Sequence, residues 1–153
     1  MKQGFVKVAS ATPRIRVADP VYNAQVICEQ AKEAAEHGAK IVVFPELCIT
    51  GYTCNDLFLQ ELLLEKAKEA LLTIAEETGQ LETLFLVGLP VDKDGRLYNV
   101  AAVLYRGRIL GMIPKKNIPM YAEFYEGRHF TPGEETVTEY RLGKQVIPFA
   151  VSY

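Results

Sequence analysis

Glu46 occupies a position in the sequence that is typical of a catalytic carboxylate. It follows the short apolar run of residues 40–44, which predicts a buried strand. Open α/β sheets bind their ligands beyond the carboxyl ends of such strands. A carboxylate at this place can take a proton from a reacting group as a general base. The alternative is a glutamate that caps a loop or pairs with a surface lysine, and its position alone does not decide between the two.

Lys115 is the second candidate, and Lys116 stands beside it. Both follow residues 108–113, the predicted return strand of a hairpin, so the sheet would hold them in place. Adjacent residues of an extended segment point to opposite faces, and therefore only one of the two can face the cavity of Glu46. A lysine ammonium there would stabilise the oxyanion of a tetrahedral transition state. The alternative, a pair of surface lysines, is the commoner situation.

Two amphipathic patterns predict helices between the strands that carry these residues. Asp19 can cap a first helix that begins at Pro20. Its apolar residues recur at spacings of three and four as far as His37, and Gly38 follows, as is typical of a helix end. A second and longer pattern extends from residue 56 to residue 78, with charged residues on its other face. Helices at these places would return the chain between parallel strands.

Short β-branched and apolar runs predict the strands, at residues 5–9, 40–44, 84–88, 98–105, 108–113, 137–140 and 145–151. The run 40–44 is almost continuously apolar, which is typical of a strand covered on both faces. Arg106–Gly107 separates two of the runs and predicts a hairpin turn. Alternating strands and helices followed by hairpins indicate an α/β layer architecture with a mixed sheet. Residues 114–133 show no clean period, and loops of this length are usually functional.

The composition is that of a soluble chain. The 153 residues are 49% hydrophobic and 24% charged, and no apolar run approaches the ~20 residues of a membrane span. Seventeen basic and nineteen acidic residues nearly cancel, so neither nucleic acid nor a membrane is an expected partner. The first residues lack the pattern of a signal peptide, which predicts a cytoplasmic location. The length fits one domain or part of one.

Cys28, Cys48 and Cys54 are the cysteines of the chain, and they form no CxxC pair. A disulfide framework and a zinc site are therefore not expected. Cys28 belongs to the apolar stripe of the first predicted helix, which indicates packing, and Cys54 stands in a loop. Cys48 remains an alternative nucleophile, because residues two apart on an extended segment share a face and Glu46 is two residues away.

Two segments resemble a known family. Residues 44–52, Phe-Pro-Glu-Leu-Cys-Ile-Thr-Gly-Tyr, resemble the FPEL-x-x-TGY segment that carries the catalytic glutamate of nitrilase-superfamily amidases, the carbon-nitrogen hydrolases. Residues 114–126 resemble, more narrowly, the lysine segment of the glutaminase domains of NAD synthetases. The resemblance implies that residues 1–153 are the N-terminal part of an α-β-β-α sandwich domain. It also implies a mixed sheet with helices on one face.

The resemblance also implies a role for each candidate side chain. Glu46 would be the general base and Lys115 the oxyanion stabiliser, while a cysteine attacks the side-chain amide of glutamine through a thioester. Lys115 is preferred to Lys116 because the family pattern K-x-x-L/I-P sets the lysine at this distance before a proline. Glu126 would orient the lysine and the substrate. Tyr121 and Tyr52 would be further substrate-binding residues.

The family's cysteine lies on a strand beyond the lysine loop, and no cysteine follows Cys54 in this chain. The resemblance therefore implies a front portion of the domain that is inactive in hydrolysis by itself. No metal or cofactor is expected in the amidase part, and ATP and magnesium would serve only a synthetase domain absent from these residues. Open strand edges predict a homo-oligomer. A free-standing amidase or nitrilase and a non-catalytic binding or scaffold module are the alternative functions.

Overall fold

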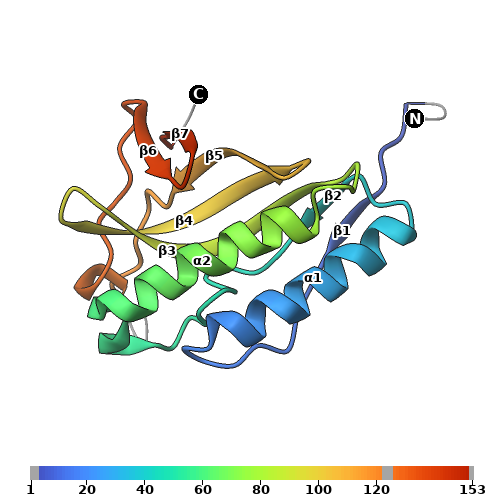
Figure 1. The fold of residues 1–153 in the computed structure, drawn as a ribbon. Coiled ribbons are helices and arrows are strands. Elements are labelled where there is room, and N and C mark those ends of the chain that lie inside the picture. Colours follow the sequence, from blue (N-terminus) through green and yellow to red (C-terminus); the bar gives the residue numbers. More distant parts are fainter. Residues whose placement is uncertain (1–3, 122–125, 152–153) are drawn as a thin grey trace.

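A computed structural model of the chain describes residues 4–121 and 126–151. Figure 1 shows a mixed sheet with two long helices side by side on one face. The strands are β1 (Val8–Ser10), β2 (Ile41–Val43), β3 (Leu84–Lys93), β4 (Arg96–Tyr105), β5 (Arg108–Pro114), β6 (Thr138–Leu142) and β7 (Gln145–Phe149). The helices are α1 (Pro20–Glu36) and α2 (Glu61–Glu77), with short 3-10 turns η1 (Asn55–Leu59) and η2 (Glu126–Arg128). The predicted mixed sheet with helices on one face is confirmed.

The sheet has the strand order β1-β2-β3-β4-β5-β7-β6. Strands β1, β2 and β3 are parallel, and α1 and α2 form the crossovers between them. Strands β3, β4 and β5 are antiparallel and β7 pairs parallel to β5. Asp94–Gly95 and Arg106–Gly107 join the antiparallel strands, with positive φ at all four residues, as type I′ hairpin turns require. The hairpin predicted at Arg106–Gly107 is confirmed.

Helix α1 has the predicted bounds because its ends are capped by the expected residues. The Asp19 carboxylate accepts a hydrogen bond from the backbone N–H of Tyr22 at 3.1 Å, and Pro20 begins the first turn. His37 is the C-cap residue. Gly38 follows with a φ of 83°, a left-handed conformation that glycine adopts without steric cost.

Several predicted elements differ from the structure; β3, for example, extends to Lys93 although the predicted run ends at Gly88. The first strand begins at Val8 rather than at residue 5, and Phe5 is 80% exposed. The second helix does not begin at Asp56, because the extended backbone of Gln60 separates η1 from α2. Strand β2 is covered on one face only, since Val42 is fully buried whereas Val43 is 45% exposed. Apolar composition alone does not reveal which face of a short strand is left open.

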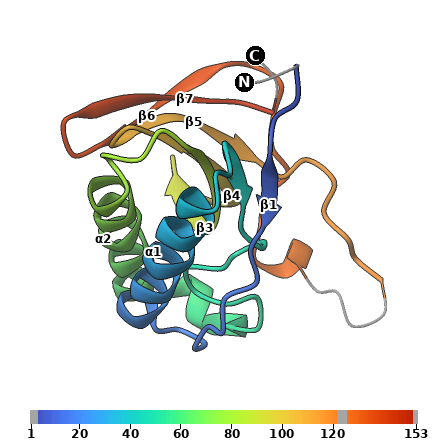
Figure 2. The same ribbon diagram turned by 90° about the vertical axis from the view of Figure 1, so that its right-hand side faces the viewer.

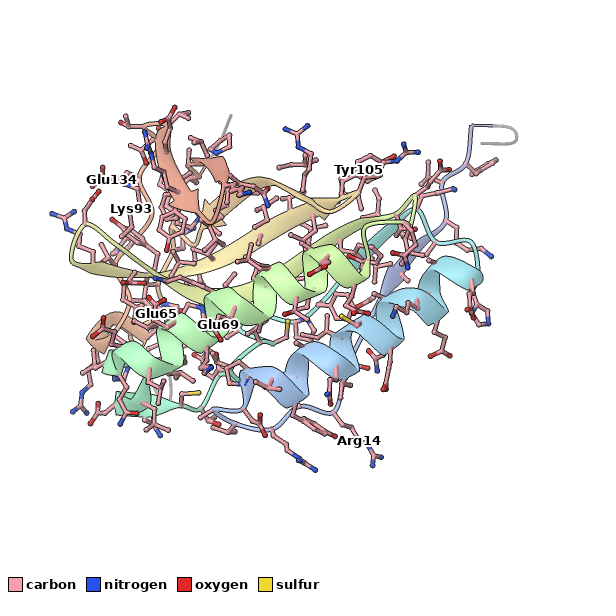
Figure 3. The ribbon with its side chains drawn as sticks, viewed as in Figure 1. Arg14, Glu65, Glu69, Lys93, Tyr105 and Glu134 are labelled. Carbon is pink, nitrogen blue, oxygen red and sulfur yellow. The ribbon has the colours of Figure 1, made fainter. Side chains whose placement is uncertain are left out.

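The hydrophobic core lies between the sheet and the helices (Figure 2). Val42 and Phe85 are register partners on the covered face, and they pack in one cluster with Ile27 of α1 and Leu71 of α2. Charged side chains point away from this layer, as Figure 3 shows for Arg14. None of the helices within residues 4–121 and 126–151 is long and apolar enough to cross a membrane.

Candidate active site

Glu46 lies on a tight turn that follows β2 and crosses over β3. The Phe44 N–H donates to Leu86 O at 2.9 Å and the Ile49 N–H donates to Gly88 O at 3.1 Å, so both sides of the turn are fixed to β3. Leu47 adopts a φ of 52° within the turn. This turn directs the Glu46 carboxylate toward the ends of β4 and β5, where its hydrogen-bond partners lie.

Lys115 follows β5 and lies between two carboxylates. Its Nζ is 2.6 Å from Glu46 Oε1 and 2.9 Å from Glu126 Oε1. Its backbone is held as well, because its N–H donates to Asn99 O at 2.7 Å and its carbonyl accepts from the Gly133 N–H at 2.9 Å. The expected proximity of Glu46 and Lys115 is therefore present, across 69 residues of sequence.

Lys116 does not share this cluster. It forms an ion pair with Glu135, and the two side chains are 50% and 70% exposed. The expectation that only one of the adjacent lysines would face Glu46 agrees with this geometry, and the structure selects Lys115 as that residue.

Glu126 is the buried acid of the cluster, with a side chain only 4% exposed. Besides Lys115, it accepts a hydrogen bond from the Tyr52 hydroxyl at 2.9 Å. It lies on η2, whose position is fixed by His129: the His129 ring Nε2 is 3.0 Å from Asp56 Oδ1 on η1. A buried carboxylate is costly unless it is paired and hydrogen-bonded, and Glu126 has both kinds of partner.

Asn99 completes the cluster, and sequence reasoning missed it. Its Nδ2 donates to Glu46 Oε1 at 2.7 Å and lies 3.4 Å from Glu126 Oε2. The residue is 4% exposed and lies within β4, between the buried residues Tyr98 and Val100. An amide inside an otherwise apolar strand was the signal that could have identified it, because buried polar groups need partners.

The charges of the cluster keep Lys115 protonated. Partial burial lowers the pKa of its ammonium, but the hydrogen bonds to Glu46 and Glu126 outweigh this effect and raise the pKa above 10.5. An ammonium held between two carboxylates is able to stabilise a nearby oxyanion without first having to gain a proton.

A cavity of about 350 Å³ lies next to Glu46 and Lys115. It occupies the sheet face opposite the helices, where Val43 and Leu86 are register partners. Apart from Glu46, Asn99 and Lys115, its walls are mainly apolar, from Val43, Leu86, Val100, Ala101, Ile113 and neighbouring residues. The cavity can therefore take a small uncharged or partly apolar group beside the polar cluster.

Tyr52 and Tyr121 are placed differently from each other. Tyr52 is partly buried and bonded to Glu126, so it supports an acid of the site. Tyr121 is 70% exposed at the end of residues 115–121, which extend away from the sheet in Figure 2. It lines a shallow hollow there with Lys115 and Lys116. Residues 122–125, part of the segment that carries the resemblance, lie outside the described residues.

The cysteines lie away from this chemistry. Burial raises the pKa of the Cys48 thiol to about 12, and the Cys48 Sγ is 3.7 Å from Gly88 O within the core. Burial also raises the pKa of Cys28 to about 11 and the pKa of Cys54 above its ordinary value. Because the thiolate is the reactive form, these surroundings disfavour Cys48 as the nucleophile. Over residues 4–121 and 126–151, no group of three or more histidine, cysteine or acidic side chains could hold a metal ion.

Comparisons with known proteins agree with the motifs and with the fold. The family model described as carbon-nitrogen hydrolase matches residues 7–151. A Mycobacterium tuberculosis protein named glutamine-dependent NAD(+) synthetase is 38% identical over 148 residues, which are 97% of this chain and 22% of that protein. The chain thus spans less than a quarter of this relative's length.

Solved structures with the same fold include two kinds of enzyme. The crystal structure of a glutamine-dependent NAD(+) synthetase from Cytophaga hutchinsonii is similar with a TM-score of 0.88 and 29% identity, over 94% of this chain and 25% of that one. An amidase variant from Nesterenkonia sp. in complex with butyramide has a TM-score of 0.70 and 24% identity, over 94% of this chain and 54% of that one.

Proposed function

This chain belongs to the carbon-nitrogen hydrolase family, and we propose that it provides the general base and the oxyanion-stabilising lysine of a glutamine-hydrolysing site. The observation that carries the proposal is the position of the Lys115 Nζ, 2.6 Å from Glu46 and 2.9 Å from Glu126. The relatives named glutamine-dependent NAD(+) synthetase support glutamine as the substrate.

The proposed reaction begins when Glu46 takes the proton of a thiol. The thiolate attacks the side-chain carbonyl carbon of glutamine, and the carbonyl oxygen becomes an oxyanion that Lys115 stabilises. Glu46 then returns the proton to the amide nitrogen as the C–N bond breaks, and ammonia leaves. Water, deprotonated by Glu46, hydrolyses the thioester to glutamate and restores the thiol.

We propose that the attacking thiol is not one of the three cysteines of this chain, and their burial and raised pKa values support this. We assign to these 153 residues the base, the lysine and the buried Glu126. In the proposed whole enzyme the ammonia serves an amidation, and ATP and magnesium belong to that step rather than to this site. Self-association and a cytoplasmic location remain predictions.

Two other functions each have an observation in their favour. The mainly apolar walls of the cavity beside Lys115 favour an amidase for small apolar amides, and the Nesterenkonia amidase structure contains butyramide. The burial of all three thiols favours a module that binds an amide without hydrolysing it.

Nuclear magnetic resonance of the purified chain separates these functions. We expect L-glutamine to shift the Lys115 side-chain signal and the backbone amide signals around it. Glu46→Gln and Lys115→Met should abolish the shifts of these backbone amides. A response to butyramide with none to glutamine would replace the proposal by the apolar-amide function. Ammonia release from the same samples would contradict the proposal that the attacking thiol is none of the three cysteines.

A further inference from the structure

We propose that Asn99 is a positioning residue of this site, which holds Oε1 of Glu46 on Lys115 and leaves Oε2 to accept the proton. The inference rests on the proposed function. It assigns a role to a side chain that neither of the two motifs contains, since Asn99 lies outside residues 44–52 and 114–126.

Asn99 contacts all three charged residues of the cluster. Its side-chain amide donates to two carboxylates: Nδ2 is 2.7 Å from Glu46 Oε1 and 3.4 Å from Glu126 Oε2. Its backbone carbonyl accepts the N–H of Lys115 at 2.7 Å. One residue of β4 thus fixes the relative positions of the base, the second acid and the lysine.

The two carboxylate oxygens of Glu46 accept different numbers of hydrogen bonds. Oε1 accepts from both Lys115 Nζ and Asn99 Nδ2. Within the described part of the chain, Oε2 receives no hydrogen bond from a side chain or the backbone. A general base needs an accessible lone pair, so the geometry assigns proton acceptance to Oε2, on a carboxylate that is 39% exposed.

An asparagine suits this place because it donates twice and carries no charge. An aspartate would add a third carboxylate near Glu46 and Glu126, whereas a leucine of similar size would remove both donors. The two substitutions at Asn99 should therefore affect the neighbouring Lys115 in opposite directions. Loss of packing alone would affect it in the same direction in both variants.

The test is a pH titration of the Lys115 side-chain signal in the full chain, for Asn99→Leu and Asn99→Asp. Asn99→Leu should lower the pKa of Lys115 by about half a unit, because Glu46 is no longer held against it. Asn99→Asp should raise this pKa, because a third carboxylate favours the ammonium. Asn117→Leu is the matched control, since Asn117 is exposed and the same substitution there should leave the titration unchanged.

A crystal structure of each variant shows how the Glu46 carboxylate is oriented. In Asn99→Leu we expect Oε1 to move out of hydrogen-bond distance of Lys115 Nζ. Unchanged titration and unchanged orientation in both variants would overturn the inference, whatever the activity of the protein. If the unsubstituted chain does not bind glutamine while the two titrations shift in opposite directions, the proposed function fails and the positioning by Asn99 stands.

Discussion

Gly88 and Leu47 approach so closely that a Cβ atom on Gly88 would lie 2.4 Å from the Leu47 backbone nitrogen. The same atom would lie 2.8 Å from Pro45 O and 3.0 Å from the backbone carbon of Glu46. The turn that carries the proposed base therefore rests directly on the backbone of β3. Only glycine permits this approach, because the neighbouring atoms belong to the backbone and cannot rotate away.

Gly88→Ala should both destabilise the protein and displace Glu46. We expect a loss of about 3 kcal/mol in the free energy of unfolding, at the upper end of the usual cost of overpacking. Urea unfolding measures this loss. Gly38→Ala is the control, because it has open space around its Cβ position and a φ of 83°, so it should cost about 1 kcal/mol of backbone strain alone. Equal losses in the two variants would contradict the close approach at Gly88.

Lys115→Met should destabilise the chain more than Lys116→Met. Removal of Lys115 leaves the buried Glu126 carboxylate without its ammonium, and we expect a loss of about 2 kcal/mol, reduced from a fully buried pair because Lys115 is 30% exposed. Lys116→Met should change stability by less than about 0.5 kcal/mol, since its ion pair is exposed.

A second substitution, Glu126→Gln, tests the cause of that loss. In the double variant with Lys115→Met, no uncompensated buried charge remains, so part of the stability should return. Additive losses in a double-mutant cycle measured by urea unfolding would show that the Lys115–Glu126 pair is not coupled.

The contribution of Lys115 to stability should depend on pH. Its pKa is raised above the ordinary lysine value of 10.5 in the folded chain, so the folded state holds its proton more tightly than the unfolded state. The contribution is therefore complete below about pH 10 and decreases as the pH rises through the folded-state pKa. The difference in unfolding free energy between the unsubstituted chain and Lys115→Met should become smaller from pH 8 to pH 11. A difference that grows over this interval would reverse the sign and refute the ion-pair interpretation.

The thiols should not react in the folded protein. A rise in the pKa of Cys48 from 9.0 to about 12 reduces its thiolate roughly a thousandfold at neutral pH, and burial restricts access as well. Iodoacetamide at pH 8, followed by mass spectrometry, should label no cysteine in buffer and all three in urea. Rapid labelling of Cys48 in buffer would restore it as a candidate nucleophile.

Asp56→Asn should loosen the turn that carries Glu126. The hydrogen bond to His129 is the main cause that lowers the pKa of Asp56, so the stabilising contact is present above the unfolded-state pKa and is lost as pH falls through the folded-state value. The amides of His129 and Phe130, which donate to Glu126 O, should exchange with deuterium faster in the variant at pH 7. Glu135→Gln removes a different surface ion pair and should leave these amides unaffected.

The elements that the sequence predicted well are those whose ends depend on local chemistry. The Asp19 cap and Gly38 set the bounds of α1, and Arg106–Gly107 sets the hairpin between β4 and β5. Two predictions were wrong, the start of α2 and the burial of β2 on both faces. Both features depend on tertiary packing. Gln60 is extended where an apolar period alone predicts helix.

The site was predictable in part. Glu46 follows the short strand β2 and Lys115 follows the hairpin strand β5, and both positions are visible in the sequence. Their contact across 69 residues was suggested by the family resemblance rather than by the residues themselves. Asn99 was missed because the face that a strand residue occupies depends on pairing register, and a pattern of apolar residues on both sides of it does not specify that face.

The two-residue turn at Asp94–Gly95 fixes the register in which β4 pairs with β3. Side chains alternate between the faces of a strand, so one inserted residue at this turn that shifted the register would exchange the two faces of β4. The amide of Asn99 would then point away from Glu46, although every residue of the polar cluster would still be encoded. The length of a surface turn thus decides whether the chain can bring Asn99 to Glu46 and Lys115.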